Sequence, residues 1–170
     1  MARDAPLAAE ARWAELLYER SRAALAGGAS PFVALLVREG ALVAEAANEV
    51  RQRCDPTAHA ELLAIRRACA ALATRDLTGA TLLTSCEPCL MCLGAALAAR
   101  LARICYGLPL ARLAELLPSF RPAGAGERPP DVARSMEMAR LRRPDFEPLF
   151  VAWTRGREVR DPASTGGIEQ

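Results

Sequence analysis

The side chains most able to do chemistry lie in two short segments. His59, the single histidine of the chain, is followed by Glu61, and Cys89 and Cys92 form a Cys-x-x-Cys pair further along. One imidazole and two thiolates can bind zinc and leave a fourth tetrahedral position open for water. Two thiolates neutralise the formal charge of Zn²⁺, so a nearby proton acceptor such as Glu61 becomes valuable. The four residues predict a hydrolytic zinc site.

Both segments fall where helices are expected to begin. Thr57 precedes a stretch of helical apolar spacing, so we expect a helix from about Ala58 with His59 and Glu61 in its first turn. Pro88 follows a predicted strand at 80–84 and marks the start of a helix running to residue 99. Cys89 and Cys92 then lie where backbone N–H groups stabilise thiolate charge.

The other patterns complete an alternation of strands and helices. They predict a helix at 6–26, a hairpin of 32–37 and 41–47, a strand at 101–107, and helices at 110–117 and 146–159. The Pro- and Gly-rich residues 118–131 predict a loop or lid, and 135–141 fits either a fifth strand or a helix. The alternation implies parallel crossovers in a three-layer α/β fold.

Composition excludes several classes of protein. The chain has 170 residues, 52% of them apolar and 25% charged, which is enough for a core and too apolar for disorder. Its 22 basic residues, all arginine, against 20 acidic ones leave a charge of +2, which does not indicate a dedicated nucleic-acid binder. No signal peptide or membrane-length apolar stretch is visible, so a cytoplasmic location is expected.

The two segments also match a known signature. His-x-Glu followed by Pro-Cys-x-x-Cys is typical of zinc deaminases that act on nucleobases. Together with Pro31-Phe32, Asn48 and the runs 55–65 and 85–94, it makes residues 30–107 resemble the cytidine deaminase-like superfamily, in its guanine deaminase and tRNA adenosine deaminase branch. The resemblance implies a three-layer α-β-α fold with a central mixed sheet of about five strands. We expect one deaminase domain over 1–160 and a mobile tail at 161–170.

The resemblance also implies roles and partners. It assigns zinc binding to His59, Cys89 and Cys92, proton transfer to Glu61, and substrate contact to Phe32, Asn48 and Ala60. The implied reaction is hydrolytic deamination of a free nucleobase, nucleoside or related heterocycle, with guanine-like purines favoured, in a homodimer. A tRNA adenosine deaminase or a cytosine or cytidine deaminase is the alternative. Cys86 is not expected to bind the metal.

The chain departs from guanine deaminases of this kind at two places. Val33 stands where they carry a glycine after Pro-Phe, and Gly107 to Phe120 contains Glu115 where they carry an aspartate. Both departures concern substrate choice.

Other interpretations of the same residues remain open. Cys86 could join the other two cysteines and His59 in a closed Cys₃His structural site, which would make the protein a non-catalytic zinc module. A thioredoxin-like use of Cys-x-x-Cys would leave the histidine without a role. Phe32 could be a core aromatic and Asn48 a turn amide. A set of C-terminal arginines could face a polynucleotide: Arg140, Arg142, Arg143, Arg155, Arg157 and Arg160.

Overall fold

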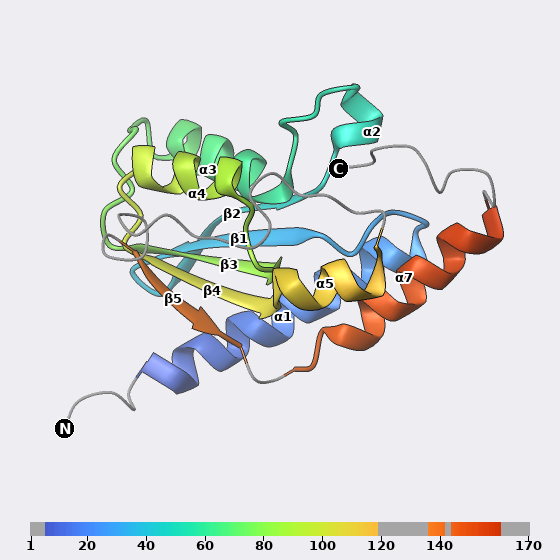
Figure 1. The fold of residues 1–170 in the computed structure, drawn as a ribbon. Helices are drawn as coiled ribbons and strands as arrows, with labels where there is room; N and C mark the ends of the chain where they lie inside the picture. Colours follow the sequence, from blue (N-terminus) through green and yellow to red (C-terminus); the bar gives the residue numbers. More distant parts are fainter. Residues whose placement is uncertain (1–5, 119–135, 142–143, 161–170) are drawn as a thin grey trace.

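The protein forms a five-stranded sheet between two layers of helices (Figure 1). The computed structural model describes residues 6–118, 136–141 and 144–160. Most of the predicted loop at 118–131 and the predicted tail at 161–170 therefore lie outside the described residues. The elements are α1 (Pro6–Ala26), β1 (Val33–Arg38), β2 (Ala41–Ala47), α2 (Val50–Arg53), α3 (Ala60–Ala71), β3 (Ala80–Cys86), α4 (Leu90–Ala98), β4 (Arg103–Leu108), α5 (Leu110–Leu116), β5 (Glu137–Arg140) and α7 (Glu147–Arg160).

The sheet is mixed, with strand order β2-β1-β3-β4-β5. β1 pairs antiparallel with both β2 and β3, whereas β3, β4 and β5 are parallel. The predicted hairpin, the five strands and the mixed sheet are confirmed. The parallel crossovers expected from the alternation hold for β3, β4 and β5. The crossover through α3 connects β2 with β3. These two strands run in the same direction, but β1 lies between them because the hairpin turns the chain back.

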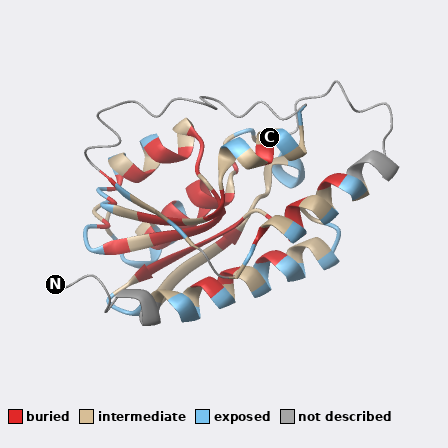
Figure 2. Cartoon of the chain, turned by 60° about the horizontal axis from the view of Figure 1, so that its bottom comes forward, coloured by how far each residue is buried: buried red, intermediate tan, exposed pale blue. Residues whose placement is uncertain are grey.

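The two faces of the sheet carry different helices. α3 and α4 cover one face, and α1 and α7 lie side by side on the other, with α5 against α7 (Figure 1). Most residues of the central strands β1, β3 and β4 are buried (Figure 2), and they belong to two cores, one on each face of the sheet. Strand β1 shows why: Ala34 and Leu36 face the α3/α4 core, and Val33, Leu35 and Val37 face the α1/α7 core. A strand buried on both faces is an unbroken apolar run.

Gly107 in β4 allows α7 to lie close to the sheet. A Cβ atom at this position would come within 2.5 Å of the Phe146 ring and 2.6 Å of the Ser85 carbonyl oxygen. Any side chain larger than hydrogen would displace backbone or a buried ring. The glycine thus fixes the segment that leads into α7 against β4.

Three local features differ from, or resolve, the expectations. The ambiguous segment at 135–141 contains strand β5, which pairs in parallel with β4 and extends the sheet by one strand. The short helix α2, in the polar sequence Val50–Arg53, was not expected. Helix α3 begins at Ala60, two residues later than expected, since the Thr57 hydroxyl donates to Asp55 and His59 takes the N-cap position. No helix among the described residues is long and apolar enough to cross a membrane.

Candidate metal centre and active site

The first residues of helices α3 and α4 bring the predicted ligands together. His59 and Cys89 are the N-cap residues of α3 and α4, each with extended backbone (φ −65°, ψ 149° and φ −72°, ψ 171°). Neither side chain makes the hydrogen bond to its own helix that an N-cap usually makes. The two side chains point instead toward each other and toward Cys92.

The three ligand atoms have the spacing of a metal site. His59 Nδ1 lies 3.7 Å from Cys89 Sγ and 3.5 Å from Cys92 Sγ, and the two sulfur atoms are 3.6 Å apart. Tetrahedral zinc with ordinary bond lengths separates two sulfurs by about 3.8 Å and sulfur from nitrogen by about 3.6 Å. These three residues are the group of possible metal ligands in the described part of the chain, and they fit zinc.

Cys86 does not belong to this group. It is 2% exposed and packs in the core of the α1/α7 face, with Leu83 and Leu108. Burial raises its pKa well above the usual thiol value, so it stays protonated. The closed Cys₃His arrangement is therefore absent from the described structure.

The electrostatics of the ligand group favour a thiolate at Cys89 and a thiol at Cys92. The hydrogen bond from Cys92, with help from His59, lowers the pKa of Cys89 to about 4. That shared proton, together with burial, raises the pKa of Cys92. Burial opposes the charged form of His59, but the hydrogen bond to Cys89 and the charge of Glu61 outweigh it and raise the pKa of His59. Thiolate and imidazole groups are zinc ligands, and a bound zinc ion would take the place of the protons that these groups share.

Glu61 lies in the first turn of α3, beside the ligand group. Its side chain is 7% exposed, and burial raises the pKa of its carboxyl group. The hydroxyl of Thr84, on β3, lies 3.2 Å from Glu61 Oε1 and 3.0 Å from the carbonyl oxygen of Cys86. A hydroxyl can donate to a carboxylate and accept from a carboxylic acid, so Thr84 can hold Glu61 in either state. Thr84 was not among the predicted site residues; its alternation with Leu83 on β3 was the signal for its facing α3.

Asn48 closes β2 and begins the segment that leads to α3. Its N–H donates to the Phe32 carbonyl at 3.0 Å, and its Oδ1 accepts from the Val50 N–H at 3.2 Å. The next residue, Glu49, donates its N–H to the Ala58 carbonyl at 3.0 Å. The residue after Asn48 is thus hydrogen-bonded to Ala58, which directly precedes the ligand His59. Its contact with substrate remains a prediction.

The side chain of Phe32 packs with aromatic residues of α7. Its ring packs edge-on against Phe150 and Trp153 of α7, with centroid distances of 5.2 and 5.3 Å. Ala60 is buried in the α3/α4 core next to the ligand His59. The structure thus brings together the predicted ligands and Glu61, and it places Phe32 with the aromatic side chains of α7. Substrate contact by Phe32 or Ala60 remains a prediction.

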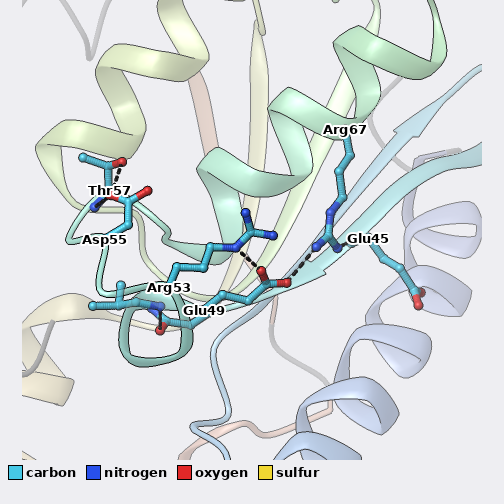
Figure 3. A network of polar contacts seen from close by, with 8 residues as sticks. Glu45, Glu49, Arg53, Asp55, Thr57 and Arg67 are labelled. Carbon is cyan, nitrogen blue, oxygen red and sulfur yellow. Dashed lines mark hydrogen bonds and ion pairs between the residues drawn. The ribbon is translucent and has the colours of Figure 1, made fainter.

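A polar network beside Asn48 was also missed (Figure 3). Glu49 binds Arg53 of α2 and Arg67 of α3, and Arg67 also binds the backbone of Glu45 in β2. The i,i+4 spacing of Glu49 and Arg53 was the available signal, since such pairs support short helices. The partner from α3 depends on the tertiary fold.

Known proteins show the same combination of sequence and fold. The guanine deaminase of Bacillus subtilis (strain 168) is 51% identical over 81 residues, covering 48% of this chain and 52% of that protein. The tRNA-specific adenosine deaminase of Aquifex aeolicus (strain VF5) is 42% identical over 79 residues, covering 46% and 52%. The chain thus spans about half the length of these curated relatives. A solved structure of a variant of NE0047 in complex with 8-azaguanine superposes with a TM-score of 0.68 at 26% identity, covering 86% of this chain and 82% of that one.

The family model for the cytidine and deoxycytidylate deaminase zinc-binding region matches residues 9–108. The match contains both helix starts that carry the ligands, and the fold agrees with the mixed-sheet α/β fold of the solved relatives. On a match that takes in more than half of the chain, the protein belongs to the cytidine and deoxycytidylate deaminase zinc-binding family.

Proposed function

We propose that the protein is a zinc-dependent hydrolytic deaminase of a free nucleobase, nucleoside or related aminated heterocycle, with a guanine-like purine favoured. The observation that carries the proposal is the buried carboxyl of Glu61 beside three ligand atoms at zinc spacing. A structural zinc site has no use for a buried acid at its edge, whereas hydrolysis needs a group that moves protons.

The residues divide the reaction between them. Zinc held by His59, Cys89 and Cys92 would lower the pKa of a water molecule and so supply a nucleophile at neutral pH. The Glu61 carboxylate accepts a proton from water, and its burial favours the protonated form that then forms. As the water oxygen bonds to the ring carbon, the acid gives this proton to the ring nitrogen. The carboxylate then takes the second proton of the former water from the new hydroxyl group and passes it to the amino group, so that the C–N bond breaks, ammonia leaves and a carbonyl remains. The Thr84 hydroxyl keeps the carboxyl oriented during these transfers.

Substrate binding falls to the start of the segment after β2. The turn at Asn48 is fixed through its Oδ1, and we propose that its side-chain NH₂ donates to the base. Phe32, linked to Asn48 by a backbone hydrogen bond, forms the adjoining apolar wall. We also propose that Ala60, directly after His59, contacts the substrate. Similarity to a guanine deaminase and to a structure with 8-azaguanine supports a purine.

A panel assay tests the proposal. Zinc-loaded protein is incubated with guanine, adenine, cytosine, their nucleosides and aminated triazines, and released ammonia is measured. We expect turnover of a free purine, with 8-azaguanine as a competitor. Release of ammonia from none of these compounds would overturn the proposal for small substrates.

Similarity to a tRNA-specific adenosine deaminase makes tRNA the alternative substrate. Among the C-terminal arginines, Arg140 and Arg155 are exposed, while the side chains of the others lie outside the described residues. A tRNA substrate would bind with steep salt dependence, because phosphate contacts release counterions. Inosine formation in tRNA with such dependence, and no activity on free bases, would select the alternative.

We also propose that the protein is a homodimer with one deaminase domain over residues 1–160. Helix α4 carries no charged side chain over Leu90–Ala98, although Leu90, Met91 and Leu97 are only half-buried. An apolar outer helix is typical of a surface covered by another protein chain. Sedimentation analysis tests the dimer: a single species at the mass of one chain would contradict it.

We also propose a cytoplasmic location. The described cysteines are all free thiols, which fits the reducing cytoplasm.

A further inference from the structure

The network around Glu49 joins three elements at the edge of the proposed active site (Figure 3). Glu49 Oε1 accepts from Arg67 Nη2 at 2.7 Å, and Oε2 accepts from Arg53 Nε. The other arm of the Arg67 guanidinium, Nη1, donates to the Glu45 carbonyl at 2.7 Å. Arg67 thus ties the end of β2 and the start of α2 to helix α3.

Asn48 is the residue held between these anchors. It follows β2 directly and precedes Glu49, so the Glu45 and Glu49 contacts fix the backbone on both sides of it. Arg67 lies on the same helix as Glu61. A rigid helix therefore connects the group that holds Asn48 in place with the group proposed to move protons.

The backbone of Glu49 adds a second link. Its N–H donates to the Ala58 carbonyl at 3.0 Å, directly before His59, and Ala58 in turn donates to the Asp55 carbonyl at 3.0 Å. The hydrogen bond between Glu49 and Ala58 therefore holds together the two ends of the segment that connects Asn48 with His59.

The network's exposure argues against a mainly stabilising role. The side chains of Arg53 and Arg67 are 52% and 44% exposed, and ion pairs at such positions add little to the free energy of unfolding. The side chain of Glu49 is the least exposed of the three, at 25%. Both arginines hold the pKa of its carboxyl group below the usual value, and the hydrogen bond from Arg53 contributes most. A charge-assisted fork of this kind restricts geometry more than it stabilises the fold.

We infer that Glu49 is a positioning residue that sets Asn48, and with it the bound base, relative to Glu61 and the metal ligands. The inference rests on the proposed function, and it adds a residue that touches neither substrate nor metal.

The test compares Glu49→Gln with Glu45→Gln in the zinc-loaded full chain. The control, Glu45→Gln, removes one carboxylate charge from strand β2. The side chain of Glu45 pairs with Arg20, whereas its contact with Arg67 is made by the backbone carbonyl and is kept in the variant. We expect Glu49→Gln to raise the dissociation constant of 8-azaguanine, measured by calorimetry, at least about fivefold, in line with a lost charge-assisted hydrogen bond. Zinc content and melting temperature should match wild type, and the control should bind 8-azaguanine normally.

A double-mutant cycle with Asn48→Ala then separates positioning from a general effect. If Glu49 acts through Asn48, adding Glu49→Gln to Asn48→Ala changes kcat/KM by less than about twofold. Additive effects of the two substitutions, or normal 8-azaguanine binding by Glu49→Gln, would overturn the inference while leaving the deaminase proposal intact. A wild-type protein that neither binds 8-azaguanine nor releases ammonia overturns the proposed function, and the role of Glu49 falls with it.

Discussion

The two faces of the sheet are packed with side chains of different size. The α3/α4 core is rich in alanine, including Ala34, Ala64 and Ala96, whereas the α1/α7 core is built around Phe146 and Phe150. Short side chains let helices approach the strands and each other closely, and large ones bury more apolar area. The first face is suited to bringing short ligands within reach of one ion, and the second to stabilising the fold.

The ligand group illustrates this difference. Cysteine and histidine side chains are short, so their helices must begin close together for three ligand atoms to lie within 4.8 Å of one another. On the opposite face, the rings of Tyr18 and Phe146 meet edge-on at a centroid distance of 5.5 Å. Substitutions on the two faces should therefore separate loss of chemistry from loss of stability.

Glu61→Gln should have the largest effect, and it should be confined to chemistry. An amide keeps the size of the side chain but cannot accept the proton, so turnover should fall by about 10²- to 10⁴-fold. The measurements are ammonia release, bound zinc and melting temperature. Turnover at the wild-type rate would show that another group moves the proton.

Phe150→Ala should have the converse effect. Phe150 is fully buried, and its removal leaves a cavity in the α1/α7 core that should lower the free energy of unfolding by about 3–5 kcal/mol. The folded fraction should still bind a full equivalent of zinc. Chemical denaturation and metal analysis of the same sample test this, and loss of zinc from the folded protein would show that the two faces are coupled.

The cysteines test the boundary between the faces. Cys89→Ser should weaken zinc binding by more than the roughly 10- to 100-fold that losing a supporting contact costs, because it removes a ligand. Cys86→Ser changes the same atom on the other side of the sheet and should keep its zinc, with only some loss of stability from the buried hydroxyl. Chelator competition measures both, and equal zinc loss in the two variants would restore the closed Cys₃His site.

The smallest expected effect concerns the ion pair between α5 and α7. Arg112 Nη2 lies 2.7 Å from Glu147 Oε1, and this hydrogen bond lowers the pKa of Glu147. A lowered carboxyl pKa contributes stability above the usual value and loses it as the pH falls through the lowered one. Wild type should melt no more than about 2 °C above Glu147→Gln at neutral pH, and the difference should vanish in acid. A difference that grows in acid would contradict this sign.

The sequence was sufficient for the parts set by local chemistry. Capping and proline preferences predicted helix starts near Ala58 and Pro88, within two residues of the observed starts at Ala60 and Leu90, and the residue types indicated the metal-binding group. The apolar periodicity predicted α1 with its observed bounds. These features depend on neighbours within a few residues, which a sequence displays directly.

The rest depends on contacts between distant segments. Whether 135–141 is strand or helix is decided by pairing with β4, and the environment of Phe32 is decided by where α7 packs. Thr84 became a site residue because β3 runs beneath α3, and Glu49 became part of a network because Arg67 reaches it from another element. Local preferences carry no information about such partners.

The contact between Arg67 and the Glu45 carbonyl has a consequence for self-association through the backbone. β2 is an outer strand of the sheet, and open backbone groups on such a strand can pair with a strand of another molecule. The guanidinium of Arg67 donates a hydrogen bond to one of these backbone groups, the Glu45 carbonyl. A bulky charged group at that point obstructs the addition of another strand, so Arg67 also opposes edge-to-edge aggregation of the sheet.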